Sequence, residues 1–347
     1  MSLIRRLSTA AAALAVAAGL GLSPALAGTT LKLGHLNPAD PMQSHSGAMA
    51  AVFKALVESG TNGEITVDLF SDGQLGKDDE VIQQVRDGVI QASISSAGGI
   101  AAHYPLVGVF DVPFAFPNIA VAHKVMNLDS AFGRTFAADV EARTGLKVVG
   151  LLDSGGFFAI SNSRRPITSV ADMKDLRIRT MTLPTHETIV SSLGGRPTPL
   201  PWAEVYTALQ TGVADGQMNP IPIIAFAKFD EVQKYLTITN HIITPYVWVM
   251  NKGFYDGLTA EQRAVVDYAA AAAVDAGRGI SRIIEASERG LPKLAKKMEV
   301  NALSASERAA FAEATQPAVR KLIVDKFGAE GEAMLNALMT EIETASK

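Results

Sequence analysis

Asp175-Leu-Arg-Ile-Arg-Thr180 and, later in the chain, Asp215-Gly-Gln-Met-Asn-Pro220 each have the pattern of a short strand. In the first stretch, apolar and basic side chains alternate up to Arg179, with the period of two that is typical of strands. In the second, Pro220 directly follows Asn219 and ends the strand, because proline cannot donate to a sheet ladder. A guanidinium and a side-chain amide therefore stand where two strands end, which is where open α/β sheets bind ligands.

Strand-like and helix-like patterns alternate on both sides of these two stretches. The predicted strands cover 31–35, 65–70, 89–95, 145–152, 157–161, 176–180, 213–219 and 246–250, and the predicted helices cover 44–60, 78–87, 185–193, 201–210, 259–288 and much of 291–347. This alternation predicts an α/β fold with mostly parallel sheets. A chain of 347 residues exceeds what one core usually spans, so we expect two lobes with a ligand cleft between them.

Several residues mark predicted helix starts. Ser169 with Asp172 and Ser304 with Glu307 have the spacing of a capping box. Thr259 precedes the longest helical pattern and is predicted to cap it.

The N-terminal segment has the features of an export leader. Arg5 and Arg6 precede an apolar run over 10–22, and Ala25-Leu-Ala27 is a small-residue cleavage site. The run is too short for a typical membrane-spanning helix, so an uncleaved anchor is the weaker interpretation. We therefore expect residues 1–27 to be removed and the mature protein to work in the periplasm.

Charge and cysteine content exclude several classes of protein. The formal net charge is −4, and it is more negative without the two leader arginines, which argues against nucleic acid and anionic membrane surfaces as partners. An anionic ligand must then be held by local donors. The chain has no cysteine, which excludes thiol nucleophiles, thiolate zinc sites and iron–sulfur clusters.

No catalytic or cofactor motif is found after the leader. The nucleophile elbow, the phosphate loop and the dinucleotide fingerprint are absent, and His186-Glu187 lacks the second histidine of a zinc-protease helix. The six histidines are scattered, so we expect no metal site and no cofactor. Asp78-Asp79-Glu80 lies at a predicted helix start, where acidic residues favour the helix dipole. We therefore expect a binding protein rather than an enzyme.

Four residues could form a carboxylate site. The planar fork of Arg179 can grip a carboxylate with two parallel hydrogen bonds, although a lone arginine on a strand is more often a surface ion pair. Arg177, earlier on the same strand face, is the better candidate for such a surface pair. Asn219 could donate its amide to the carboxylate or serve only as a turn residue before proline. Trp202 could wall a pocket or pack in a core, and Arg165 could reach the ligand or remain an exposed loop charge.

Seven blocks in a fixed order resemble the extracytoplasmic solute-binding proteins of TRAP (tripartite ATP-independent periplasmic) transporters, of the DctP type. The blocks are Gly73-Gln-Leu-Gly76, Tyr104-Pro105, Asp111-Val-Pro-Phe114 and the segments 171–179, 197–206, 208–220 and 235–241. They cover nearly the whole chain after the leader. Together they are far more specific than any single short motif.

The resemblance implies a two-lobed fold of the periplasmic-binding-protein type, which closes on its ligand and has one long helix spanning both lobes. After a leader at 1–27, it places 28–155 and 245–285 in lobe 1, and 156–244 and 286–347 in lobe 2. It also implies a small organic anion as ligand, the small and large TRAP membrane permease subunits as partners, and a monomer.

The resemblance also gives roles to individual residues. The arginine matching Arg179 forms the main salt bridge to a ligand carboxylate, and the asparagine matching Asn219 supports it. An aromatic ring at the position of Trp202 lies against the ligand. The arginine matching Arg165 often adds a second contact.

First-lobe positions bear on the choice of ligand. Ser96 and Tyr246 align with positions that vary with the ligand, and His35, near the end of the first strand, is expected to line the cleft. The segments 179–182 and 199–206 are similar to members that bind ectoines. Of the aromatic cage of those members only Trp202 is retained, and the acidic residue that they carry after the first strand is missing.

Several ligands and classes of protein remain open. The apolar, proline-rich segment 220–226 beside an arginine favours a small hydroxy or oxo monocarboxylate, and a dicarboxylate fits if Arg165 reaches the cleft. An ectoine-like zwitterion is an alternative ligand. An exported hydrolase or isomerase, or a ligand sensor that docks on a membrane signalling protein, is an alternative of a different class.

Overall fold

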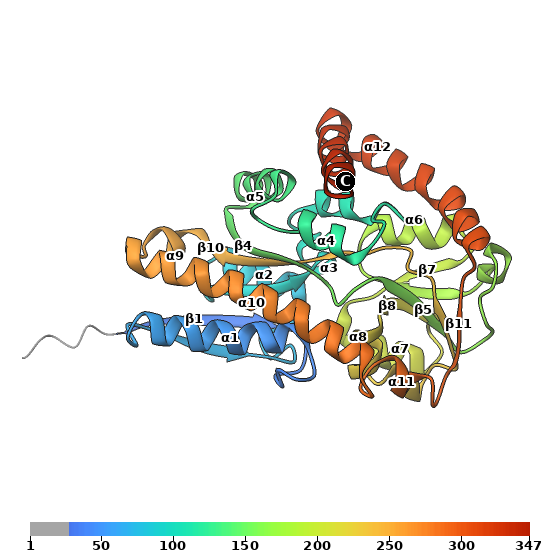
Figure 1. Ribbon diagram of the computed structural model, residues 1–347, viewed down its shortest axis with the longest axis horizontal. Coiled ribbons are helices and arrows are strands. Elements are labelled where there is room, and N and C mark those ends of the chain that lie inside the picture. Colours follow the sequence, from blue (N-terminus) through green and yellow to red (C-terminus); the bar gives the residue numbers. More distant parts are fainter. Residues whose placement is uncertain (1–27) are drawn as a thin grey trace, which may run out of the picture.

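The computed structural model of the protein describes residues 28–347, which form two lobes with one sheet each (Figure 1). The predicted leader and its cleavage site lie outside the described residues. Within 28–347, no helix combines the length and the apolar character needed to cross a membrane.

The first lobe is built on a five-stranded sheet. Its strands are β1 (Thr29–His35), β2 (Ile65–Phe70), β3 (Ala92–Ser96), β4 (Leu146–Asp153) and β10 (Pro245–Asn251). They lie in the order β2-β1-β3-β10-β4. β1 is parallel to β2 and β3, whereas β10 is antiparallel to both β3 and β4. The antiparallel strand, β10, is the one that enters from the other lobe, after β9.

The second lobe is built on a six-stranded sheet. Its strands are β5 (Phe158–Asn162), β6 (Arg177–Thr180), β7 (Arg196–Pro199), β8 (Gly216–Pro220), β9 (Tyr235–Ile238) and β11 (Glu299–Ala302). They lie in the order β11-β9-β5-β8-β6-β7, with β6 parallel to β7 and β8. β5 follows β4 of the first lobe after a short link and is antiparallel to β8 and β9. In each sheet all strands run in one direction except the one that crosses over from the other lobe, so the prediction of mostly parallel sheets is confirmed.

Helices and 3-10 turns cover the two sheets. Those before the second sheet are α1 (His45–Gly60), α2 (Asp78–Arg86), α3 (Ala97–Ile100), η1 (Pro105–Asp111), α4 (Ile119–Val125) and α5 (Ala131–Thr144). Those that follow are η2 (Val170–Met173), α6 (Pro184–Ser192), η3 (Trp202–Glu204), α7 (Val205–Gln210), α8 (Ile221–Phe226), η4 (Phe229–Glu231), α9 (Lys252–Asp256), α10 (Ala260–Ala286), α11 (Leu291–Leu294) and α12 (Ala305–Ala345).

The two longest helices extend across both lobes, as Figure 1 shows in orange and red. α10 packs against α1 and β4 of the first lobe and against α8 and α11 of the second, so the predicted helix spanning both lobes is confirmed. α12 packs against α6 as well as η1, α4 and α5. It bends sharply at Gly328, whose φ of 58° lies in the left-handed region that favours glycine.

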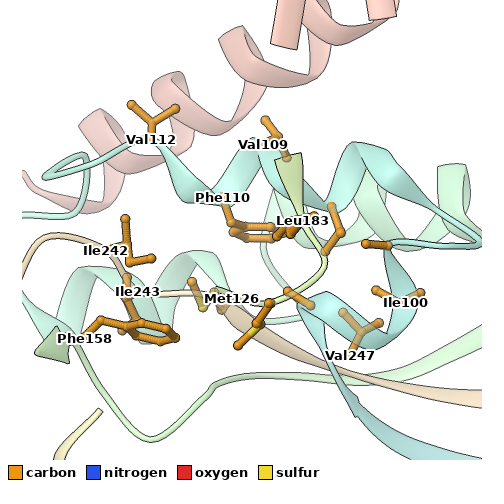
Figure 2. Packing of buried hydrophobic residues seen from close by; sticks show 14 of the residues in the cluster. Ile100, Val109, Phe110, Val112, Met126, Phe158, Leu183, Ile242, Ile243 and Val247 are labelled. Atoms are coloured by element: carbon orange, nitrogen blue, oxygen red, sulfur yellow. The ribbon is translucent and has the colours of Figure 1, made fainter. Parts of the chain in front are cut away.

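A large hydrophobic core is shared by the two lobes (Figure 2). Val109, Phe110 and Val247 come from the first lobe, and Phe158 and Leu183 come from the second. Because this core is continuous, the assignment of 28–155 with 245–285 to one lobe and 156–244 with 286–347 to the other stays a prediction.

Local signals placed most elements correctly. The predicted capping boxes at Ser169 and Ser304 are present, and Thr259 caps α10 with its hydroxyl accepting from the Gln262 amide at 3.1 Å. Two predictions were wrong. The region after 291 contains the edge strand β11, which is held by its pairing with β9 and has no strong strand pattern of its own. The predicted helix over 201–210 begins as the 3-10 turn η3, and Pro201 is its N-cap.

Candidate functional site

A cavity of about 890 Å³ lies between the two lobes. In the first lobe, the lining side chains come from the segment after β1, from the start of α2, from the end of β3 and from β10. In the second lobe, they come from the ends of β6 and β8 and from η3, α7 and α8. Five of the seven predicted site residues line it: Ser96, Arg179, Trp202, Asn219 and Tyr246.

Arg179 is held with its side chain almost fully buried. It is the last residue but one of β6, with 3% of its surface exposed, on the opposite face from Leu176 and Ile178. Its Nε and Nη2 both donate to the carbonyl oxygen of Leu200, at 3.0 and 2.7 Å. This grip fixes the plane of the guanidinium. Nη1 has no hydrogen-bond partner among residues 28–347 and is available to a group in the cavity.

The charge of Arg179 is not matched by an ion pair within the described residues. Burial lowers the pKa of its guanidinium to about 10, and the nearby Asp78 opposes that shift. The group remains fully charged at neutral pH. A buried cation of this kind is stabilised by an anion that enters the cavity.

Asn219 lies near the end of β8, the strand next to β6, and lines the same cavity as Arg179. It is 1% exposed, and its Nδ2 donates to Gln217 Oε1 at 2.6 Å. Gln217 in turn donates to Ser161 Oγ at 2.8 Å. This buried chain of polar groups sets the orientation of the Asn219 amide and leaves its second hydrogen for a ligand.

An aromatic wall closes the second-lobe side of the cavity. Trp202 begins η3, and its ring lies 6.2 Å from that of Phe226 and 5.9 Å from that of Phe229, measured between centroids. Tyr206 also lines the cavity. The apolar, proline-rich segment that ends at Phe226 forms the short helix α8. Sequence reasoning identified Trp202 alone, because the other rings come from segments whose fold positions were unknown.

Ser96 and Tyr246 form the facing wall in the first lobe. They are register partners across β3 and β10. The Tyr246 hydroxyl accepts a hydrogen bond from Asn37 Nδ2 at 3.2 Å, and burial raises its pKa, so it keeps its proton. Ser96 donates to Asp78 Oδ2 at 2.8 Å.

Asp78 is a cavity residue that sequence reasoning assigned only to the helix dipole. It is the first residue of α2, and it lines the cavity with its side chain half-buried. Burial raises the pKa of its carboxyl to about 7, against the opposing effects of the Ser96 hydrogen bond and of Arg179. The sequence did hold a signal for this role, because Asp78-Asp79-Glu80 has more acidic residues than a helix start needs. One of them is enough, and Glu80 fills that role by accepting from the Lys77 amide at 3.0 Å.

Arg165 and His35 do not line the cavity. Arg165 donates from Nε to the Asp172 carbonyl at 2.8 Å and from Nη2 to the Lys174 carbonyl at 2.5 Å, so its guanidinium holds the η2 turn. His35 is buried beside the cavity, with Nδ1 3.3 Å from Ser46 Oγ, and burial lowers its pKa to about 4. A dicarboxylate held by both Arg165 and Arg179 does not fit this arrangement.

The two lobes touch across the mouth of the cavity. Lys77 Nζ of the first lobe lies 3.3 Å from Glu204 Oε1 of the second. Deeper in, Gly98 packs so closely on Met181 that an added Cβ would come within 2.8 Å of its side chain. The cleft is thus in a closed arrangement. No group of three or more histidine, cysteine or acidic residues in 28–347 is placed to hold a metal ion.

The chain is similar to a family of known transport proteins. Residues 35–326 match the model of the family described as "Bacterial extracellular solute-binding protein, family 7". The 2,3-diketo-L-gulonate-binding periplasmic protein YiaO of Escherichia coli (strain K12) is 35% identical over 315 residues, covering 90% of this chain and 92% of that protein. The C4-dicarboxylate-binding periplasmic protein DctP of Rhodobacter capsulatus is 34% identical over 335 residues, covering 94% and 96%.

Solved structures share the fold. The crystal structure of the sugar acid binding protein from Advenella mimigardefordensis strain DPN7T, in complex with galactonate, superposes with a TM-score of 0.82. The sequences are 32% identical, and the alignment covers 90% of this chain and 99% of that one. The two-lobed α/β architecture described above is therefore that of a periplasmic solute-binding protein.

Proposed function

Because the chain belongs to the bacterial extracellular solute-binding proteins of family 7, we propose that it captures a small organic carboxylate in the periplasm and delivers it to TRAP membrane permease subunits. It acts as a monomeric receptor and does not transform its ligand. The cleft between two lobes suits this task, since closure of the lobes can retain a ligand and reopening can release it.

The observation that carries the proposal is the state of Arg179. Its guanidinium is buried at the base of the cavity, fixed in orientation by Leu200, and without a carboxylate partner among residues 28–347. A charged group in that position is costly unless a ligand supplies the opposite charge. A carboxylate is the anion that a planar fork binds best, and Asn219 adds a neutral donor beside it.

The first test is a thermal-shift screen of the mature protein against hydroxy acids, oxo acids, sugar acids, dicarboxylates and ectoines. A ligand that binds only the folded state raises the melting temperature through a free energy of RT ln(1 + [L]/Kd). We expect a shift with one class of carboxylate. NMR spectroscopy of the recovered ligand separates a receptor from an exported hydrolase or isomerase, since only an enzyme changes the ligand's covalent structure.

Substituting Arg179 tests the site itself. Arg179→Ala should weaken binding by roughly 1.5–3 kcal/mol or more, because a charge-assisted contact is lost. Arg179→Lys should also bind weakly, since an ammonium cannot reproduce the fork. Arg196→Ala is the matched control: that arginine lies on the neighbouring strand, 68% exposed at its side chain and paired with Asp175. If Arg179→Ala binds as tightly as Arg196→Ala, the site assignment is wrong.

A further inference from the structure

The cavity contains a carboxyl group that the fold does not need. Asp78 starts α2, but Glu80 already accepts the free amide of the helix start. Asp78 has no salt bridge among the described residues, and its only hydrogen bond within them comes from Ser96. Its Oδ1 has no partner within the described residues. The side chain thus has an acceptor available on the cavity side.

The surrounding chain is shaped to admit this carboxyl. At Gly99, an added Cβ would lie 2.5 to 2.8 Å from the Asp78 side chain, so any other residue there would displace it. Ser96 Oγ accepts from the Gly99 amide at 3.2 Å while it donates to Asp78 Oδ2, which links the carboxyl to the N-terminal turn of α3. Asp78 is therefore held in place by packing and by a hydrogen bond, not left free on the surface.

The charges around the cavity divide between its two sides. The second lobe presents the guanidinium of Arg179. On the first-lobe side, four acidic residues line the cavity, namely Asp72, Asp78, Asp79 and Glu80. The one basic side chain lining that side within the described residues is Lys77, which pairs with Glu204. A ligand with one carboxylate can satisfy Arg179, whereas a second carboxylate would face like charge.

Neutral hydrogen-bonding groups accompany Asp78 on this wall. The hydroxyls of Ser96 and Tyr246 and the amide of Asn37 all line the cavity. Such a set suits hydroxyl groups, each of which can both donate and accept. Burial raises the pKa of Asp78 to about 7, so the ionised carboxylate is accessible near neutral pH, and this form accepts hydrogen bonds from hydroxyls more strongly than a neutral group does.

We propose that the ligand is a polyhydroxylated monocarboxylate of the sugar-acid class, and that Asp78 selects it by hydrogen bonding to one of its hydroxyl groups. This proposal rests on the proposed function, in that Arg179 binds the carboxylate. Asp78 acts as a specificity-determining residue, and Ser96 is a positioning residue that orients it.

The test is isothermal titration calorimetry with gluconate, succinate, butyrate and ectoine as probes, at pH 7.5. We expect gluconate to bind at least tenfold more tightly than the other three. Asp78→Asn keeps the shape of the side chain and removes its charge. This variant should bind gluconate at least tenfold more weakly than the parent and should bind butyrate with an affinity within about twofold of the parent's. It should bind succinate more tightly, because the like charge that repels the second carboxylate is gone. Ser96→Ala should also lower the affinity for gluconate, by a smaller factor.

Asp68→Asn is the matched control, since Asp68 is exposed on β2 away from the cavity. Melting curves of the ligand-free variants check that Asp78→Asn is folded. The proposal is overturned if succinate binds more tightly than gluconate to the parent, if Asp78→Asn binds gluconate as the parent does, or if ectoine is the tight ligand and is lost with Asp78. If no carboxylate binds the parent, the proposed function fails as well; if binding depends on Arg179 but not on Asp78, only the present proposal fails.

Discussion

Two arginines on one strand show how contacts decide the role of a residue. Arg177 and Arg179 lie on the same face of β6. Arg177 pairs with Asp215, through Nη2 at 2.7 Å and Nε at 3.0 Å, and Asp215 also binds Arg164. These pairs hold the pKa of Asp215 well below its usual range, despite the opposing effect of burial. Within the described part of the chain, the guanidinium of Arg179 bonds only the Leu200 carbonyl oxygen, and its charge is available to a ligand. The sequence predicted both the place of Arg179 near the strand end and the surface pair of Arg177, but only the structure identifies Asp215 as the partner of Arg177.

At the same scale, His45 should make stability depend on pH. Its ring is fully buried against Tyr246, and neither ring nitrogen has a hydrogen-bond partner among residues 28–347. Burial lowers its pKa from 6.5 to about 4. Between those values the unfolded chain binds more protons than the folded protein, so the stabilisation present above pH 6.5 is lost as the pH falls towards 4.

The expected loss from this histidine is roughly 2 kcal/mol between pH 7.5 and pH 5. Urea unfolding of the parent and of His45→Phe at both pH values measures it, because phenylalanine does not titrate. The parent should lose more unfolding free energy than His45→Phe over this interval. If both proteins lost the same unfolding free energy, protonation of His45 would not destabilise the folded protein, and the prediction would be wrong. His35 has the same sign of shift, so some pH dependence should remain in the variant.

At the scale of elements, the ends of helices were predicted better than the pairing of strands. The predicted capping boxes at Ser169 and Ser304 involve residues three apart, and the structure contains both. β7 and β11 carry little pattern of their own and exist through pairing with β6 and β9. An edge strand takes its hydrogen bonds from a neighbour that is distant in sequence, so a local pattern does not reveal it.

Removing the cap of α10 should lower stability without changing the site. Thr259→Ala loses the acceptor for the Gln262 amide, and such substitutions usually lower the unfolding free energy by about 1 kcal/mol. Thr259→Ser, which keeps the hydroxyl, is the control. Chemical denaturation gives the stability and calorimetry gives the affinity. A parallel loss of ligand affinity in Thr259→Ala would mean that the helix end is coupled to the cleft.

At the scale of the whole molecule, the lobes are joined by a link with unusual backbone geometry. Gly155 and Gly156, between β4 and β5, have φ values of 111° and 118°, which glycine adopts without strain. Arg282 of α10 donates to the Gly155 carbonyl, and Ser154 donates from its amide to Thr244 in the second link at 3.0 Å. The long helix is therefore bonded to the 154–156 link, which is in turn bonded to the link that precedes β10.

The Lys77–Glu204 ion pair joins the two lobes and should stabilise the closed arrangement of the cleft. Both side chains are 49% exposed, so the pair contributes at most about 1 kcal/mol. Glu204→Gln should therefore raise the dissociation rate of the ligand by up to about fivefold, with little change in the association rate, and the difference should shrink at high salt. Stopped-flow kinetics measures both rates. If Lys77→Met raises the dissociation rate equally in the parent and in Glu204→Gln, the two residues act independently and the pair is not a closure contact.

The amino-acid sequence by itself determined the α/β class, most helices and strands, and the candidates Arg179, Asn219 and Trp202, because periodicity and strand ends depend on neighbours in the chain. Tertiary structure alone decided the rest. It turned Arg165 towards η2 and buried His35 beside the cavity, and it brought Asp78 into the cavity. The ionisation and the accessibility of a side chain depend on groups that are far apart in sequence. They become defined only when the two lobes close on one another.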